Sequence, residues 1–109
     1  MLATDAVMSE RLTLGYREAV ALSDSVLAPA GTRVRGHEFH RTVATPAAGS
    51  APAWRWAGRS GPAHPEGFAS GGVHASYLHL SWAGSPALAE RFVAACAAAV
   101  RGEAWHAHR

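Results

Sequence analysis

Two stretches in the first half of the chain alternate between apolar and polar residues, which is the pattern of a β-strand with one buried face. Residues 11–17 alternate in this way, and residues 32–41 do so again after a segment rich in turn-forming Ser, Asp, Pro and Gly. A third run at 73–82 is apolar and aromatic and follows two glycines, as is typical of a buried strand. Because strand side chains alternate, this third strand would carry His79 and Ser81 on one face.

A different spacing near the end of the chain predicts a helix over about 86–101. Ser85 is a favourable cap residue, Pro86 a favourable first helical residue and Gly102 a favourable stop. Apolar residues recur every four positions through this segment: Leu88, Phe92, Cys96 and Val100. This stripe is expected to pack against the sheet and to bury the Cys96 thiol.

The stretch between the second and third predicted strands has another composition. Residues 45–65 are rich in Pro, Gly, Ala and Ser, which predicts a long surface loop with at most one short strand at Trp54-Arg55-Trp56. The order strand, strand, loop, strand, helix indicates an α/β fold. Little precedes residues 11–17 for them to pair with, so this fold is expected to be part of a larger open sheet.

Composition narrows the class of protein. With 109 residues the chain is one domain at most, and 49% hydrophobic against 17% charged residues favours a globule. All ten cations are arginines, scattered from Arg11 to Arg109 without a run of three, so nucleic-acid binding is not expected. The lone cysteine forms no internal disulfide and favours a cytoplasmic location. The longest apolar run, 92–100, is far shorter than the roughly 20 residues of a membrane helix, so no membrane association is expected.

Seven histidines raise the question of a metal site. The closest pairs are His37 with His40 and His106 with His108. On a strand the members of the first pair would point to opposite faces, and the second pair lies at the end of the chain. No metal site is therefore expected, and His37 and His40 are interpreted as hydrogen-bonded strand residues or as supports of a site.

Cysteine and histidine together can form a nucleophilic site, because an imidazole that takes the thiol proton produces a reactive thiolate. Cys96 is a poor candidate if the helix stripe buries it, so a cysteine partner of His79 is expected outside this chain. The pattern alone leaves two readings of His79 open, a hydrogen-bonded core histidine or a general base. Trp54-Arg55-Trp56 and Gly71-Gly72 are interpreted as packing and turn residues, since neither lies in a binding motif.

Three segments resemble, in order and spacing, the C-terminal part of the cobyrinic acid a,c-diamide synthases. They are Leu-Thr-Leu-Gly-Tyr-Arg-Glu-Ala at 12–19, Arg-Gly-His-Glu-Phe-His at 35–40, and Gly-Gly-Val-His-Ala-Ser-Tyr-Leu-His-Leu at 71–80, the last followed by Trp82. This family, of cobalamin biosynthesis, joins a synthetase domain that uses ATP and Mg to a glutamine amidotransferase domain, and amidates two carboxylates of a corrin-type ring. The resemblance implies that residues 1–109 are a C-terminal fragment of a class I, flavodoxin-like amidotransferase domain.

The resemblance also implies roles for individual residues. In the Tyr-Leu-His segment, His79 matches the histidine that takes the proton of the catalytic cysteine and returns it to the departing ammonia. Two residues later, related enzymes often have a glutamate and this family tends to have a histidine, whereas this chain has Ser81, which supplies no charge. The possible supports of the imidazole are therefore Ser81, whose hydroxyl can accept a hydrogen bond, and Glu38.

The cysteine elbow and the ATP-binding domain have no counterpart in these 109 residues. The chain is therefore expected to bind no cofactor by itself, and to act on glutamine and a corrin-type ring only together with the missing part. Three hypotheses stay open: a fragment that works beside a chain carrying the cysteine, a degenerate remnant, or a non-catalytic homodimeric binding module.

Overall fold

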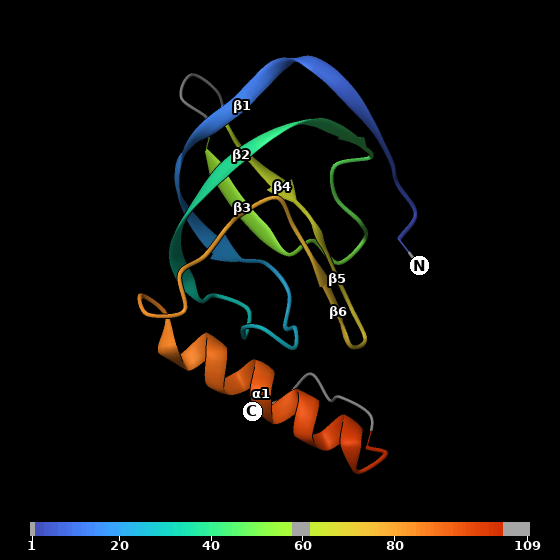
Figure 1. Ribbon diagram of the computed structural model, residues 1–109, viewed down its shortest axis with the longest axis vertical. Coiled ribbons are helices and arrows are strands. Elements are labelled where there is room, and N and C mark those ends of the chain that lie inside the picture. Colours follow the sequence, from blue (N-terminus) through green and yellow to red (C-terminus); the bar gives the residue numbers. More distant parts are fainter. Residues whose placement is uncertain (1, 58–61, 104–109) are drawn as a thin grey trace.

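The computed structural model describes residues 2–57 and 62–103, which form strands and one helix (Figure 1). In chain order the elements are β1 (Asp5–Ala21), β2 (Arg33–Thr45), β3 (Trp54–Ala57), β4 (Ala63–Glu66), β5 (Phe68–Ser70), β6 (Val73–Ala75) and α1 (Pro86–Val100). An antiparallel sheet has the order β2-β1-β3-β4, and β5 and β6 form a separate antiparallel pair. The described chain is mostly β-sheet with one helix, so the prediction of strands followed by a C-terminal helix is confirmed.

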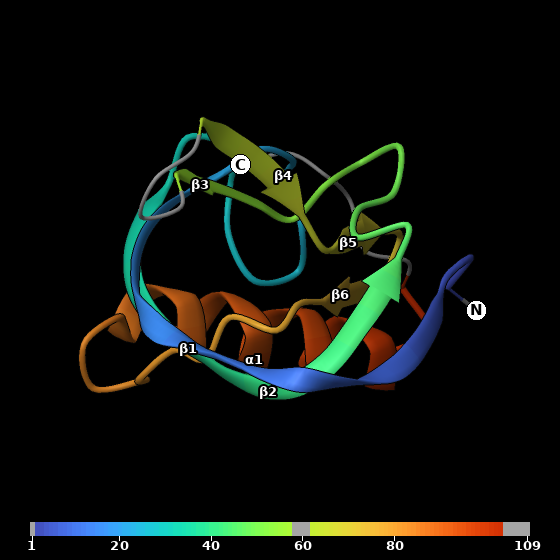
Figure 2. The same cartoon turned by 90° about the horizontal axis from the view of Figure 1, so that it is seen from above.

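The two longest strands form an arch. They pair antiparallel from Asp5 opposite Thr45 to Val20 opposite Arg33. Both strands bend strongly and wrap around the shorter strands, as Figure 2 shows from above. The two strands predicted from the alternating pattern are confirmed, and each is longer than predicted because the pairing continues beyond an irregularity between Met8 and Thr13.

The concave side of the arch holds the core. Trp54 is fully buried and Trp56 is 3% exposed. The residues around them are mainly small or aliphatic: Ala19, Ala21, Leu27, Ala28, Val34, Ala53, Ala69, Leu78 and Leu88. Because so many of these are alanines, the two indole rings contribute much of the buried apolar surface.

The predicted loop at 45–65 is partly wrong. The short strand expected at the tryptophans is β3, and its neighbour β4 begins at Ala63, inside the predicted loop. Trp54 and Trp56 stand at alternate positions of β3 and both point into the core, which confirms their interpretation as packing residues. The pairing of β3 with β1 depends on residues distant in sequence, which composition does not reveal.

The predicted buried strand at 73–82 is also wrong. Only Val73–Ala75 forms a strand, β6, and the chain returns to the sheet at a single bridge between His79 and His37. Leu78 is buried, but His79 and Ser81 are exposed. The apolar and aromatic run is therefore divided between a hairpin strand, a turn and an edge contact.

The helix α1 agrees with the prediction to within one residue. Gly102 follows it at φ 77°, a left-handed conformation that favours glycine, which confirms the predicted stop. Ser85 occupies the cap position and Pro86 begins the helix, as predicted, although the Ser85 hydroxyl makes no cap hydrogen bond.

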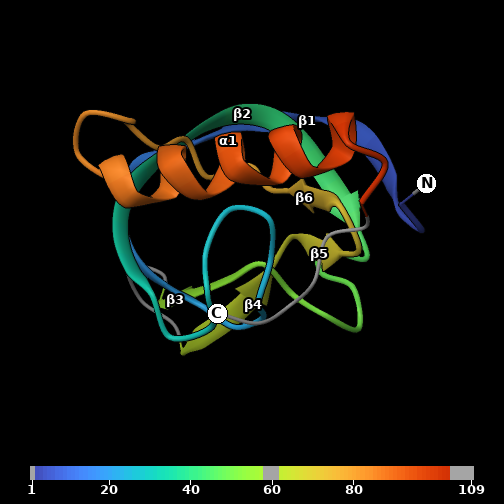
Figure 3. The same ribbon diagram turned by 90° about the horizontal axis from the view of Figure 1, so that it is seen from below.

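The apolar stripe of α1 packs at one end only. Leu88 is its one buried residue, and the Arg91 Nε donates a hydrogen bond to the carbonyl of Ser25 at 2.7 Å. Cys96 is exposed and Val100 is 88% exposed, so the predicted burial of the thiol is wrong. The helix lies across the lower end of the strands (Figures 1 and 3), and its first turns hold it there. Within residues 2–57 and 62–103, no helix is both long and apolar enough to cross a membrane.

Candidate functional site

His79 is tied to β2 through its backbone. Its amide donates to the carbonyl of His37 at 2.8 Å, and its carbonyl accepts from the His37 amide at 3.0 Å. This reciprocal pair extends the sheet by one residue beyond β2. The segment carrying His79 is therefore placed by the sheet, although it is not itself a regular strand.

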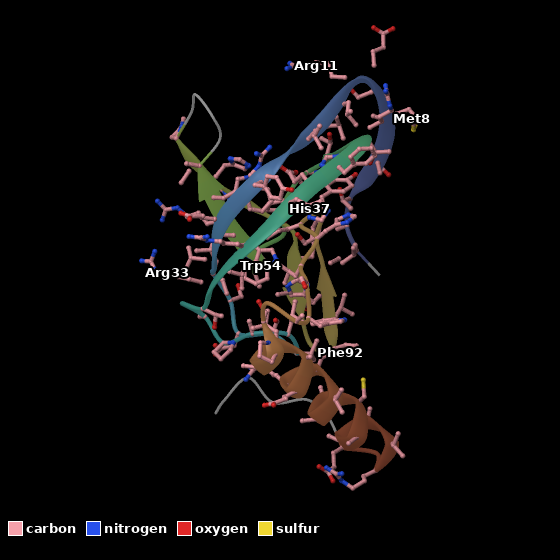
Figure 4. The ribbon with its side chains drawn as sticks, turned by 60° about the vertical axis from the view of Figure 1, so that its left-hand side comes forward. Met8, Arg11, Arg33, His37, Trp54 and Phe92 are labelled. Carbon is pink, nitrogen blue, oxygen red and sulfur yellow. The ribbon has the colours of Figure 1, made fainter. Side chains whose placement is uncertain are left out.

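The imidazole of His79 lies on the outer, convex face of the arch. Its ring centroid is 5.0 Å from that of His37, and the His37 ring is 6.2 Å from that of Tyr16 on β1. His37, on β2, is labelled in Figure 4. His79 and Tyr16 are exposed, the latter by 90%. The first reading of His79, a buried core histidine, is therefore wrong, and the ring is open to any group that approaches this face.

Close approach of the two backbones depends on Gly36. A Cβ at this position would lie 2.6 Å from the His79 carbonyl oxygen and 2.8 Å from Cγ of Leu78, closer than such atoms are found. Leu78 fills the space that a side chain at Gly36 would need, and so points into the core. The glycine of the 35–40 motif thus lets the His79 segment dock on β2.

A buried carboxylate holds the same segment from the other side. Glu66, at the end of β4 and 6% exposed, accepts hydrogen bonds from the Ser76 hydroxyl at 2.6 Å and from the Tyr77 amide at 2.8 Å. The Ser76 hydroxyl in turn accepts from the Leu78 amide at 2.9 Å. Burial raises the pKa of Glu66, the two hydrogen bonds oppose this, and the charge of Glu38 adds to it.

Glu38 lies on the opposite face of β2 from His37. Its carboxylate binds the Nε of Arg17 and the Nε2 of His40, each at 2.9 Å. Since neighbouring strand residues point to opposite faces and the His37 and His79 rings share one face, the structure does not bring Glu38 to the His79 imidazole. The predicted separation of His37 and His40 onto opposite faces is confirmed.

An inner polar cluster, formed by Arg17, Glu38, His40, Tyr77 and Glu66, was not foreseen. The rings of His40 and Tyr77 stack with centroids 3.7 Å apart and an interplanar angle of 11°. The Tyr77 hydroxyl also forms a 2.5 Å hydrogen bond with the Thr42 hydroxyl. Together these groups line a hollow of about 330 Å³ on the concave side. Its one sequence signal is the alternation of Glu38 and His40 with the outward-facing His37 and Phe39.

The remaining candidates are dispersed. Ser81 is exposed two residues beyond His79, and Cys96 is exposed on α1. His106 and His108 lie outside the described residues. Among residues 2–57 and 62–103, no group of three or more His, Cys, Asp or Glu side chains is arranged to hold a metal ion.

Comparisons with known proteins show the family to which the chain belongs. The family model of the CobB/CobQ-like glutamine amidotransferase domain matches residues 1–87. The chain therefore belongs to the CobB/CobQ-like glutamine amidotransferase domain family.

Three relatives that resemble the chain are named as a,c-diamide synthases. The chain is 64% identical over 91 residues to the hydrogenobyrinate a,c-diamide synthase of Streptomyces coelicolor, a match that covers 84% of this chain and 18% of that protein. It is 47% identical to the enzyme of the same name from Mycobacterium tuberculosis, over 86% of this chain and 21% of that protein. Identity to the cobyrinate a,c-diamide synthase of Gloeobacter violaceus is 44%, over 84% and 19%. The chain spans about a fifth of the length of these relatives, and no solved structure matches it.

Proposed function

We propose that this chain supplies the general-base histidine, His79, of a glutamine amidotransferase site. The observation that carries the proposal is the position of this imidazole. It is exposed on the outer face and anchored to β2 through both backbone hydrogen bonds with His37. The nucleophile is a cysteine outside these 109 residues, which docks on the face where the ring is accessible.

The chemistry at this site is thioester formation and hydrolysis. The neutral imidazole of His79 takes the proton of the thiol, and the thiolate attacks the side-chain amide carbon of glutamine. As the C–N bond breaks, the imidazolium returns the proton and ammonia leaves. Water then hydrolyses the thioester to glutamate and regenerates the thiol.

The relatives' names extend the proposal to the use of the ammonia. Residues 1–109 are a C-terminal part of a flavodoxin-like amidotransferase domain in a cytoplasmic hydrogenobyrinate or cobyrinate a,c-diamide synthase. The ammonia amidates two ring carboxylates, and ATP with Mg²⁺ serves a synthetase part outside this chain. In the part of the chain that the structure describes, no group of three or more His, Cys, Asp or Glu side chains is arranged to hold a metal ion, and the proposal places Mg²⁺ in that synthetase part.

Complementation tests the proposal. The Streptomyces coelicolor synthase, truncated before the region that matches this chain, is mixed with the 109-residue chain, and glutamate release from glutamine is measured. We expect release only from the mixture, and loss of release with His79→Asn. The control His64→Asn, at an exposed histidine of β4, keeps the activity. An active His79→Asn mixture, or ammonia release by the chain alone that depends on His79, contradicts the proposal.

A second candidate is a non-catalytic homodimer, favoured by the outer face itself. Leu14 of β1 and Phe39 of β2 stand directly opposite each other and are 61% and 59% exposed. Two copies joined through this face would cover the same surface that an amidotransferase partner would cover.

A further inference from the structure

Three arginines, two from β2 and one from β3, lie on one face of the sheet. Val20 of β1 stands opposite Arg33 of β2 and also opposite Arg55 of β3. Directly opposite residues of neighbouring strands share a face, so Arg33 and Arg55 flank Val20 on the same side. Arg35 follows two positions after Arg33 on β2 and therefore joins them.

The spacing of these arginines suits a ligand larger than a single ion. Strands lie about 4.8 Å apart, so the Cα atoms of Arg33 and Arg55, two strands apart, are separated by roughly 10 Å. Arg33 and Arg35 are about 7 Å apart along β2. All three line one open hollow of about 720 Å³, which Ser81 and Ser85 also border. This volume lies within the usual range of small-molecule sites.

The charge in this hollow is poorly compensated. Glu18 is the one acidic residue among the described residues that line it, and its carboxylate pairs with Arg35 at 3.2 Å. The side chains of Arg33 and Arg55 have no hydrogen bond or ion pair with any described residue. No described residue therefore neutralises the guanidinium groups of Arg33 and Arg55, and each can donate hydrogen bonds to a ligand in the hollow.

We infer that this arginine hollow binds a small polyanion, a molecule carrying two or more carboxylate or phosphate groups. A guanidinium binds either oxyanion through two parallel hydrogen bonds. A single anionic group reaches one arginine, whereas a polyanion can bind Arg33 and Arg55 at once. Its negative charges then offset the electrostatic repulsion between the two guanidinium groups. The site stands independently of the role proposed for His79, since none of its contacts involves that ring.

Titration of the 109-residue chain tests the inference at low ionic strength, where charge screening is weak. The probes are tricarballylate for a polycarboxylate, tripolyphosphate for a polyphosphate and acetate as the monoanion. Binding of each probe is measured by calorimetry and by the shift of the guanidinium NMR signals. We expect at least one polyanion to bind more tightly than acetate. Arg33→Gln and Arg55→Gln are each expected to weaken it about tenfold, the loss of one charge-assisted pair.

Arg11→Gln is the matched control, because Arg11 and Arg33 lie at well-separated places on the sheet, as Figure 4 shows. This variant loses the same charge and should bind the polyanion as the unaltered chain does. The stronger of the two polyanion probes identifies the carboxylate or phosphate source. The inference is overturned if neither polyanion binds more tightly than acetate, or if Arg11→Gln weakens binding as much as Arg33→Gln. Far-UV circular dichroism confirms that each variant keeps its fold.

Discussion

At the scale of single residues, the position of the His79 segment depends on two residues that take no part in the proposed reaction. Gly36 provides the space in which the His79 carbonyl approaches β2, and Glu66 binds the backbone just before it. The histidines and the glutamate of the 35–40 motif were the candidate site residues, but Gly36 of the same motif contributes as much to the position of His79.

Gly36→Ala is expected to displace this segment. The added methyl would overlap the His79 carbonyl, so the backbone would have to shift. Overpacking of this kind lowers the free energy of unfolding by about 1–3 kcal/mol. Urea denaturation measures the loss, and the His79 amide signal in NMR reports the displacement. Gly72→Ala is the matched control, since nothing lies within 4 Å of its Cβ. Equal losses in both variants would show that the close approach at Gly36 is unimportant.

Glu66 is expected to make stability depend on pH. Burial raises the pKa of its carboxyl in the folded chain, so the folded state holds the proton more tightly than the unfolded state does. Its contribution is therefore full below the ordinary glutamate pKa and declines as pH rises through the folded value. Urea denaturation from pH 4 to 7 compares the chain with Glu66→Gln, whose amide does not titrate.

The stability advantage of the unaltered chain over Glu66→Gln should shrink with rising pH. Titrating groups that do not interact with Glu66 are common to both proteins and cancel in the difference, whereas Glu38 and His40 interact with its charge and contribute to the difference. An advantage that grows with pH would mean that the hydrogen bonds from Ser76 and Tyr77 outweigh burial.

At the scale of elements, α1 is held by its first turns. Leu88 is the buried residue of the helix and Arg91 reaches the Ser25 carbonyl, while the residues beyond them are largely exposed. The four-residue spacing predicted the helix itself correctly, because periodicity reports a possible apolar face. Whether a surface covers that face depends on the rest of the fold, and here it is covered only in part.

Leu88→Ala is therefore expected to release α1 from the sheet. Loss of a buried leucine side chain costs about 2–5 kcal/mol, and more where the site collapses less. Hydrogen exchange of the α1 amides measures the release. Val100→Ala, at 88% exposure, should leave exchange unchanged, and a similar effect of both variants would place the anchor elsewhere.

At the scale of the whole molecule, the two faces of the arch differ in kind. The concave face buries the tryptophans, whereas the convex face exposes Leu14, Tyr16 and Phe39 beside the histidine pair. An exposed apolar face of this kind is typical of a face on which another protein surface packs. The two proposed functions differ in what that surface is.

Phe39→Glu is expected to weaken association through this face, because a carboxylate would have to lose its hydration there. Sedimentation of the isolated chain distinguishes the two functions. A defined dimer that Phe39→Glu dissociates supports the homodimer, whereas a monomer that loses complementation with Phe39→Glu supports the amidotransferase. Val100→Glu, on the exposed end of α1, is the control and should change neither measurement.

The sequence alone determined the local features of this protein. Alternation predicted β1 and β2, spacing and flanking residues predicted α1, and three motifs in order indicated the family, because each is a property of neighbouring residues. Tertiary structure alone decided which distant residues meet. Most of the predicted strand at 73–82 is a turn, which Glu66 holds through hydrogen bonds to Ser76 and Tyr77. Arginines from β2 and β3 lie together on one face of the sheet. Antiparallel pairing brings together residues that are far apart in the sequence, and the local patterns that predict a strand do not identify its partner.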